Sequence, residues 1–423
     1  MNNSPLNSRH LQLNAKMADF GGWLMPIEYP DTGVIAEYSA VRQQVGVFDV
    51  SHLGKISVKG EGALGFLNEM LTNDLNRITA GQAQYSLLCN EDGGVVAEYS
   101  AVRQQVGVFD VSHLGKISVK GEGALNFLNQ MLTNDLNRIK AGQAQYSLLC
   151  NEDGGVVDDL IVYRNSDTDL FLVPNASNTS SVFKILNDQA PSSVEVKNLH
   201  NEYGVIALQG PKSAQVLEIL GVKSSIDYME FINTTIDNCP VILCRTGYTG
   251  EFGFEIIPMW ADTEKVWDKL ITVVKQLNGV ACGLGARDVL RTEMGYPLHG
   301  HELSLEITPV QASASWAIGW QKDSFRGKQT LVEQKQVGTK FKLRAIVATD
   351  RGIPRKDMQV KDKTGKIIGT VTSGTFSPGL KKGIGLALIN PEIVKGDQVL
   401  IDIRGADSLF NVVDLPFVPS KVR

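Results

Sequence analysis

The chain has 423 residues, more than one hydrophobic core usually organises, so we expect two or three domains. Its 41 Lys and Arg against 46 Asp and Glu leave a formal charge of -5, which argues against nucleic-acid or anionic-membrane partners. No apolar run approaches the roughly 18 residues that span a bilayer, and the opening residues lack the apolar core of a secretory signal, so we expect a cytoplasmic protein.

Residues 36–96 are followed directly by a nearly identical copy, residues 97–157. The copies differ at three pairs of positions only: Gly65 and Asn126, Glu69 and Gln130, and Thr79 and Lys140. Solenoids need several stacked units whose sequences normally drift apart, and here there is one repetition with almost no drift. The pattern therefore indicates a tandem duplication, or an error in the gene model, rather than a repeat fold.

Each copy predicts a strand followed by a helix. In the second copy GKISVKG alternates like a strand, and the apolar residues after it fall at helical spacing: Ala124, Leu125, Leu128, Met131 and Leu132. The two copies therefore compete for one place in the fold. Only the second copy continues into Asp158 and Asp159, so we expect it to supply the working part of any site built on those residues.

Beyond the copies, strand and helix signals are mixed. LIVY and LFLVP read as strands around the polar turn RNSDTD, and VIALQGPKSAQVLEIL reads as strand, turn and helix with Pro211 in the first turn. Asp262 can cap a helix with one apolar face, and a further helix is predicted from GLGARD to VLRTEMG. That apolar face holds Val266, Trp267, Leu270, Val274 and Leu277. This is α+β patterning.

After about Trp320 the pattern changes to short strands separated by Gly, Pro, Asp and Lys turns. The strand candidates are KLRAIVAT, KIIGTVTSG, GIGLALI and QVLIDI. We therefore expect a separate all-β domain at the C-terminus.

Six segments carry a resemblance to a known family. They are KMADFGGWLMPIEY, VRQQVGVFDVSHLGKISVKG in both copies, NEDGGVVDDLIVY, RTGYTGEFGFEI, GLGARDVLRTEMGYPLHGHEL and TSGTFSPGLKKGIGLAL. A single short motif such as GYTGE is weak, whereas six in one order along the chain exclude a chance match. Over its whole length, apart from one repeat unit, the chain resembles the glycine cleavage system T-proteins, which are aminomethyltransferases.

The resemblance implies a three-domain cloverleaf: two ferredoxin-like α+β domains and a C-terminal β-barrel, with an extra duplicated N-terminal segment. The first domain would join residues 1–115 to 199–305, the second would span 116–198, and the barrel 320–423. Where the copy at 36–96 sits is left open. The residues by themselves support only α+β followed by β.

The implied reaction transfers a methylene group from the aminomethyl-dihydrolipoyl arm of a carrier, the glycine cleavage H-protein, to tetrahydrofolate, with release of ammonia. Tetrahydrofolate is then the cofactor and the lipoylated carrier the protein partner, with no metal, nucleic acid or membrane. The alternatives are a folate-dependent demethylase, a non-catalytic folate-binding relative, and a product inactivated by the duplication. The first would need an attached dinucleotide-binding domain, whose GxGxxG would open a βαβ unit. The iron-sulfur relatives carry Lys-Gly-Cys, which the chain lacks.

Asp158 and Asp159 follow two glycines and precede an apolar strand, so one carboxylate can face a site while its neighbour points away. The resemblance makes Asp159 the catalytic residue, acting as a general base or as the group that orients the pterin. The alternative is that the pair merely caps a turn at the start of a strand.

The resemblance places further residues around the folate. Glu255 and Arg287 match its acidic and basic contact positions, where Arg can pair with a carboxylate and Glu can accept from pterin nitrogens; the two could instead form a surface salt bridge. The other positions are Tyr146, Tyr163, Asn175, Tyr248, His113 and Leu114, the last two doubled by His52 and Leu53. Each Tyr could instead belong to the core. We assign the His-Leu loop to the second copy, because that copy is continuous with Asp159.

Two further features are expected to play no part in the chemistry. His299 and His301 form a His-Gly-His pair without a third ligand at metal-binding spacing, so we expect a solvated turn. Phe252 stands where an acidic or polar residue is usual in the family, and we expect this change to affect only the surface of its loop.

Overall fold

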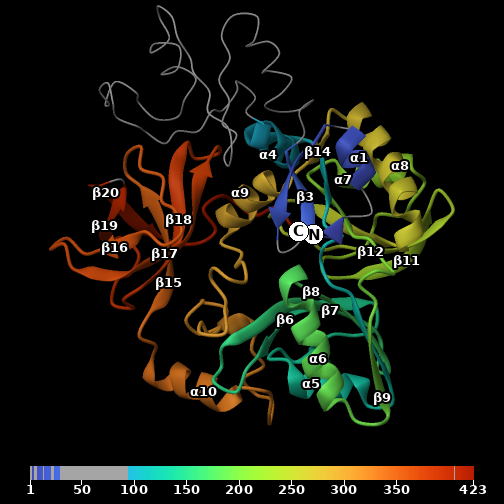
Figure 1. Ribbon diagram of the computed structural model, residues 1–423, viewed down its shortest axis with the longest axis horizontal. Helices are drawn as coiled ribbons and strands as arrows, with labels where there is room; N and C mark the ends of the chain where they lie inside the picture. The colour runs from blue at the N-terminus through green and yellow to red at the C-terminus, as the bar shows by residue number, and fades with distance from the viewer. Residues whose placement is uncertain (1, 4–6, 13, 21–22, 29–93, 404) are drawn as a thin grey trace, which may run out of the picture.

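The structure, a computed structural model, describes residues 2–3, 7–12, 14–20, 23–28, 94–403 and 405–423. The first copy up to residue 93, with His52 and Leu53, lies outside the described residues, and so does the placement of the extra segment. Figure 1 shows three lobes, of which two are α+β and the third is a barrel. The described fold is therefore built from the second copy, residues 97–157.

The first α+β lobe is organised by a six-stranded sheet in the order β11-β12-β13-β10-β4-β14, in which only β14 and β4 run parallel. Its strands are β4 (Gly107–Asp110), β10 (Ile206–Gln209), β11 (Phe231–Ile236), β12 (Cys239–Cys244), β13 (Gly253–Pro258) and β14 (Val280–Cys282). Its helices are α4 (Gly94–Gln104), α7 (Ser213–Ile219), α8 (Thr263–Gln276) and α9 (Leu284–Met294).

Helices cover both faces of this sheet, as the alternation of side chains along its strands requires. Val108 on β4 packs into one hydrophobic cluster with residues of α7 and α8, such as Trp267. The next residue, Phe109, packs into another with residues of α4 and α9, such as Leu290. Helix α9 therefore lies on the face of the sheet opposite α7 and α8.

A small N-terminal group of elements lies beside this lobe (Figure 1). It consists of β1 (Asn2–Asn3), α1 (Asn7–Gln12), β2 (Lys16–Phe20) and β3 (Trp23–Glu28), with the strands in the order β1-β3-β2. Met17 packs against the cluster under α7 and α8, which ties the group to the first lobe.

The second lobe is an antiparallel sheet in the order β6-β7-β8-β5-β9. Its elements are β5 (Ile117–Gly121), α5 (Ala124–Met131), β6 (Gln143–Cys150), β7 (Val156–Ser166), β8 (Asp169–Pro174), α6 (Thr179–Gln189) and β9 (Val194–Asn198). Without the edge strand β6, the order β7-β8-β5-β9 with a helix after β5 and another after β8 is ferredoxin-like. Leu128 of α5 and Leu186 of α6 share one core with Val119 of β5.

The third lobe follows α10 (Lys328–Val337) and closes as a barrel in the order β15-β18-β17-β16-β19-β20. The strands are β15 (Lys342–Ala348), β16 (Gln359–Lys361), β17 (Ile367–Ser377), β18 (Lys382–Ile389), β19 (Gln398–Ile403) and β20 (Ala406–Val413). Inward-facing Ile346, Val371 and Phe410 fill its core. The predicted fold class, α+β followed by a C-terminal β-barrel, is confirmed.

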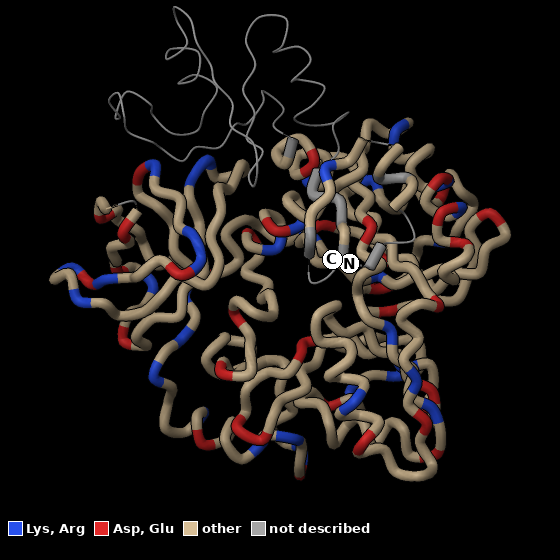
Figure 2. The backbone as a smooth tube through the Cα atoms, viewed as in Figure 1, with Lys and Arg blue, Asp and Glu red and all other residues tan. Residues whose placement is uncertain are grey.

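Charges and helix lengths add two observations. Figure 2 shows Lys and Arg interspersed with Asp and Glu along the backbone of all three lobes. Within the part of the chain that the structure describes, no helix is long and apolar enough to cross a membrane.

One local prediction was wrong. Asp262 occupies the position before α8, but its side chain makes no capping hydrogen bond. Thr263 instead donates its hydroxyl to the Met259 carbonyl at 3.0 Å, because a short 3-10 turn over Trp260–Asp262 already leads into the helix.

The three residues that distinguish the second copy from the first all lie on the surface. Asn126 and Gln130 are exposed on α5, and Lys140 is exposed between α5 and β6. Every residue that the second copy buries is therefore also present in the first copy. The second copy carries Asn126 inside α5 where the first carries Gly65, and Gly is the poorer helix former by a few tenths of a kcal/mol.

We predict that a chain lacking residues 36–96 keeps the described fold, because the contacts of residues 97–157 are retained. The matched control lacks residues 97–157 instead, which leaves the same sequence except at the three exposed positions. Its free energy of unfolding should be lower by about 1 kcal/mol or less, since Gly65 then enters the helix. Urea unfolding of both chains measures the difference, and a gap above roughly 3 kcal/mol would show that the three positions matter more than their exposure indicates.

Candidate active site

Two consecutive carboxylates stand near the beginning of β7. Asp158 is completely buried and Asp159 is half-buried, as expected for neighbours that point to opposite faces of a strand. In the register of the sheet Asp158 lies opposite Leu149 and Asp159 opposite Leu148, so both side chains are fixed by the ladder between β6 and β7. The strand therefore presents one carboxylate to the protein interior and the other to a partly open site.

Asn175, just after β8, connects the two carboxylates. Its side-chain nitrogen Nδ2 lies 2.9 Å from Oδ1 of Asp158 and 2.9 Å from Oδ1 of Asp159, and its backbone N–H donates to Oδ2 of Asp158 at 2.9 Å. Asn178 adds a further donor to Oδ1 of Asp158 at 2.7 Å. These contacts exclude the interpretation of the pair as only a local turn cap, because the partners come from 16 to 20 residues further along the chain.

Tyr146 on β6 holds the other oxygen of Asp159. Its hydroxyl donates to Oδ2 at 3.0 Å, and its ring stacks on Trp316 with 5.1 Å between the centroids. Trp316 belongs to the segment between α9 and α10 and is 65% exposed. The carboxylate is thus connected through two aromatic rings to the surface.

Burial is the main cause that raises the pKa of Asp159 above its ordinary value. The hydrogen bond from Tyr146 and the positive charge that His299 can carry both oppose the rise. Burial also raises the pKa of the Tyr146 hydroxyl, so that it remains a proton donor to the carboxylate. The site therefore favours a carboxylate that takes up a proton more readily than an exposed Asp does.

Tyr248 connects Arg287 on α9 with the region around Asp159. The guanidinium carbon lies 4.6 Å from the Tyr248 ring centroid, and the Tyr248 hydroxyl donates to the carbonyl of Pro297. Burial is the main cause that raises the pKa of Tyr248, and the negative charge of the nearby Asp159 adds to the rise. Among the described carboxylates, none forms an ion pair with Arg287, so the predicted alternative of a Glu255–Arg287 salt bridge is wrong.

Neutral hydroxyl groups contact Glu255 on β13. Its Oε2 accepts the hydroxyl hydrogen of Thr246, whose oxygen lies 3.3 Å from the Tyr163 hydroxyl. The Tyr163 ring is buried and meets Phe231 edge to face at 5.4 Å, so it belongs to the core and reaches the site only through its hydroxyl. Glu255 is close enough to Arg287 to oppose the lowering of the arginine pKa by burial.

His113 and Leu114 form the loop between β4 and β5. His113 is 3% exposed, and burial, followed by the positive charge of Arg287, lowers its pKa from 6.5 to about 3. Leu114 packs half-buried against the cluster under α4 and α9. The structure thus brings His113 to the neighbourhood of Arg287, and the second copy supplies both residues of the described loop.

We predict that His113 contributes to loss of stability in acid. The unfolded chain takes up a proton on this residue as the pH falls through 6.5, whereas the folded chain does so only near 3. The contribution to stability is thus present above 6.5 and is lost between 6.5 and about 3, at up to about 1.4 kcal/mol per pH unit. Urea unfolding across this pH range should show a shallower decline for His113→Asn.

The same substitution in the first copy, His52→Asn, is the matched control for His113. Because the described loop is built from the second copy, the control should keep the slope of the parent chain. An equal change of slope in both variants would contradict the assignment.

The His-Gly-His pair after α9 lies in a turn with an exposed Gly300, as predicted, but its two imidazoles are not freely solvated. His299 and His301 are both half-buried: the Nε2 atom of His299 lies 3.0 Å from the Val156 carbonyl, and Nδ1 of His301 lies 3.1 Å from Oγ of Ser373. They bridge the start of β7 and the barrel strand β17. Among the described residues, no group of three or more His, Cys, Asp or Glu could hold a metal ion.

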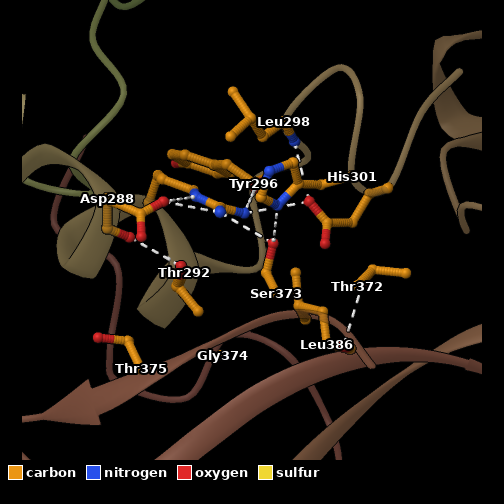
Figure 3. A network of polar contacts seen from close by, with 12 residues as sticks. Asp288, Thr292, Tyr296, Leu298, His301, Thr372, Ser373, Gly374, Thr375 and Leu386 are labelled. Carbon is orange, nitrogen blue, oxygen red and sulfur yellow. Dashed lines mark hydrogen bonds and ion pairs between the residues drawn. The ribbon is translucent and has the colours of Figure 1, made fainter. Parts of the chain in front are cut away.

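A buried charge network joins α9 to the barrel. Figure 3 shows Asp288, His301 and Ser373 around its centre. The guanidinium of Arg291, 2% exposed, pairs with Asp288 at 2.7 Å and with the fully buried Glu302 at 3.1 Å, and donates to Oγ of Ser373 at 2.9 Å. One turn of helix separates Arg291 from Arg287, so this network fixes the helix that presents Arg287.

A second buried network holds the same C-terminal end of α9. Arg103 of α4 pairs with Glu293 at 2.7 Å and with Glu251 at 3.0 Å, and Ser377 of β17 donates to Glu293 at 2.5 Å. All four side chains are buried. Helix α9 is therefore attached by charged groups to α4, to the loop before β13 and to the barrel.

The prediction that Phe252 alters only its loop surface was wrong. The ring packs against the core cluster under α7 and α8, and the guanidinium carbon of Arg245 lies 3.5 Å from its centroid. Arg245 in turn donates to the carbonyl of Val422 at 2.6 Å, and the Lys421 N–H donates to the Gly250 carbonyl at 2.7 Å. The aromatic residue thus helps to dock the C-terminal segment on the GYTGE loop.

Two family models match the chain. The model of the GCVT N-terminal domain matches residues 6–99 and again residues 94–322, and the model of the glycine cleavage T-protein C-terminal barrel domain matches residues 342–419. This chain belongs to the glycine cleavage T-protein family.

Relatives of the T-protein family match over nearly the full chain. An aminomethyltransferase of Parafrankia sp. is 46% identical over 420 residues, which cover 99% of this chain and 98% of the relative. An aminomethyltransferase of Mycolicibacterium paratuberculosis is 44% identical over 421 residues, covering 99% and 97%. The crystal structure of glycine cleavage system aminomethyltransferase T from Bartonella henselae matches with a TM-score of 0.80 at 29% identity, covering 99% of this chain and 98% of that one.

These likenesses confirm the resemblance inferred from the six motifs, the fold class, and the T-protein function. They favour neither the demethylase nor the non-catalytic alternative. The roles of the individual T-protein site residues remain predictions.

Several polar and aromatic residues of the T-protein site carried no clear signal in the sequence. Trp316 reaches Tyr146 from 170 residues away, and Thr246 links Tyr163 to Glu255 across two sheets. Asn178 could have been suspected, because it follows Asn175 by three residues at the start of a helix.

Proposed function

We propose that this chain is a tetrahydrofolate-dependent aminomethyltransferase that acts with a lipoylated carrier protein, the glycine cleavage H-protein, in the cytoplasm. The observation that carries the proposal is the carboxylate of Asp159, half-buried and hydrogen-bonded to Tyr146 and Asn175. Tyr248 lies between this region and Arg287, which forms no ion pair with a described carboxylate. Family membership supplies the reaction, and the arrangement of these side chains supports a role for each.

The residues fit tetrahydrofolate by their chemistry. Arg287 forms no ion pair with a described carboxylate and lies against Tyr248, so its N–H donors suit a carboxylate of the folate tail. Glu255 and Asp159 offer carboxylate acceptors for the N–H groups of a pterin. Tyr146 and Trp316 add stacked aromatic surface beside Asp159.

Bound tetrahydrofolate would supply the two amine nitrogens that take up the methylene carbon, while ammonia leaves and the carrier arm regains its thiol. Asp159 would orient one folate N–H and accept its proton as the new carbon–nitrogen bond forms. A raised pKa suits this role, because an acceptor works best when its pKa approaches the working pH. Tyr146 and Asn175 would hold the carboxylate in position by one hydrogen bond to each oxygen.

We predict that Asp159→Asn lowers the rate constant kcat of methylene transfer by about 100-fold or more, because the amide cannot accept the proton. Folate binding should remain measurable, since the amide keeps the shape of the carboxylate. Single-turnover assays with a lipoylated, aminomethylated carrier give the rate, and equilibrium titration with tetrahydrofolate gives Kd.

The matched control for Asp159→Asn is Asp167→Asn, the same change on a carboxylate that is 74% exposed at the turn after β7. It should keep the parent rate. If Asp159→Asn turned over as fast as this control, Asp159 would not be the proton acceptor.

We predict that Arg287→Met weakens binding of tetrahydrofolate by about 10-fold to 100-fold, the range for loss of a charge-assisted hydrogen bond. Tetrahydropteroate lacks the glutamate tail, so its Kd should be the same for the variant and the parent. Substitution of the exposed Arg351 by Met is the matched control. Equal weakening of both ligands would place Arg287 at the pterin rather than at the tail.

A further inference from the structure

Asp158 is a buried carboxylate that the proposed reaction leaves without a role. Its side chain has no exposed surface, and its neighbour Asp159 brings a second carboxylate to the same amide of Asn175. A buried charge is costly unless it is paired or fully hydrogen-bonded. The contacts of Asp158 therefore need an explanation.

The partners of Asp158 are all N–H donors. Oδ1 accepts from Nδ2 of Asn175 and from Nδ2 of Asn178, and Oδ2 accepts from the backbone N–H of Asn175. None of these groups can accept a hydrogen bond, so a proton on either oxygen of Asp158 would face a donor. The surroundings are therefore built for the ionised form, although burial and the neighbouring Asp159 raise the pKa of Asp158.

The partners of Asp159 are different. Oδ2 meets the hydroxyl of Tyr146, which can donate to a carboxylate and can equally accept from a carboxylic acid by rotating its hydrogen. Asp159 is also half-buried, so it can exchange a proton with a ligand or with water. Of the two carboxylates, Asp159 is thus the one that can change its protonation state without losing a hydrogen bond.

We infer that Asp158 is a positioning residue that stays ionised, holds the side chain of Asn175 together with Asn178, and thereby orients Asp159. The inference rests on the proposed function, because it assumes that Asp159 takes up a proton during methylene transfer. Asp158 itself does not contact the reacting atoms.

The fixed charge has a second effect. A like charge that shares the Asn175 amide disfavours ionisation of Asp159 and makes it the better proton acceptor. Other groups face Asp159 as well: Tyr146 from β6 and His299 from the segment after α9 lower its pKa, and Tyr248 from the loop before β13 lies near it. The pKa of Asp159 is therefore set by the sum of these opposing effects.

The test is the pH dependence of kcat/KM for methylene transfer by the full chain. In the parent, activity should fall on the acid side as Asp159 becomes protonated. Asp158→Asn removes the neighbouring charge and should move this acid limb to lower pH by about one unit or more. It should also lower the plateau of kcat, because Asn175 loses an anchor, while Kd for tetrahydrofolate changes less than twofold.

A second variant, Asn178→Ala, tests the inference even if Asp158→Asn does not fold. Asn178→Ala removes one donor from Asp158 at a half-buried position, so the fold should tolerate it. Because Asp158 then ionises less readily, the acid limb should move in the same direction by a smaller amount. The exposed Asp167→Asn variant should leave the profile unchanged.

The outcomes separate the two proposals. An acid limb that persists in the residual activity of Asp159→Asn would overturn the proposed role of Asp159. An acid limb that disappears in Asp159→Asn, but stays in place in both Asp158→Asn and Asn178→Ala, would overturn the role of Asp158 alone and leave it a structural residue. A shift in both variants with a lowered plateau supports the inference.

Discussion

Burial of charge on helix α9 is the constraint on which the arrangement of the first lobe and the barrel depends. Arg291 and Glu293 lie completely or almost completely inside the protein, and each has partners on the barrel strand β17 as well as on the α+β part. Removing one member of such a network leaves an uncompensated buried charge, which typically costs about 3–5 kcal/mol. The barrel and the first lobe are therefore fixed to one helix by contacts that do not tolerate partial separation.

The same helix also carries Arg287, one turn before Arg291, toward Tyr248. Arg291 has partners on several segments, whereas Arg287 forms no ion pair with a described carboxylate. In our proposal, neighbouring positions of one helix thus divide structural and ligand-binding roles. The position of Arg287 is then determined by the contacts that Arg291 makes one turn further along the same face of the helix. This arrangement gives the proposed site a rigid cationic group that forms no ion pair with a described carboxylate, although Glu255 lies near it.

Local patterns in the sequence predicted several elements and the order of α+β followed by β, whereas the three-domain arrangement with a barrel came from the family resemblance. Alternation predicted β5 and β17, and helical spacing predicted α5 and α8, because these signals arise within a few residues. The order of motifs supplied the family and thereby the pair of carboxylates. Contacts between distant segments were not predictable in this way: His299 and His301 read as a polar turn, yet both are bound to other lobes.

Phe252 illustrates the same limit. An aromatic residue in a glycine-rich loop gives no sign that Arg245 and the C-terminal segment lie over it. Asp158 is a related case: the sequence places it beside Asp159, and the resemblance places Asn175 at the folate, but neither shows that Asn175 and Asn178 donate to Asp158. Site residues whose partners come from several elements become interpretable only when those elements are assembled.

The repeat has a practical consequence for mass spectrometry. Cleavage after Lys and Arg releases residues 43–55 and residues 104–116 as the same peptide, QQVGVFDVSHLGK, so a chemical label on His113 has the same mass as one on His52. After the identical tetrapeptides 56–59 and 117–120, the products 60–77 and 121–138 differ at two positions, which are exposed on α5 in the second copy. These two peptides therefore distinguish the copies by mass, whereas the peptides that carry His52 and His113 do not.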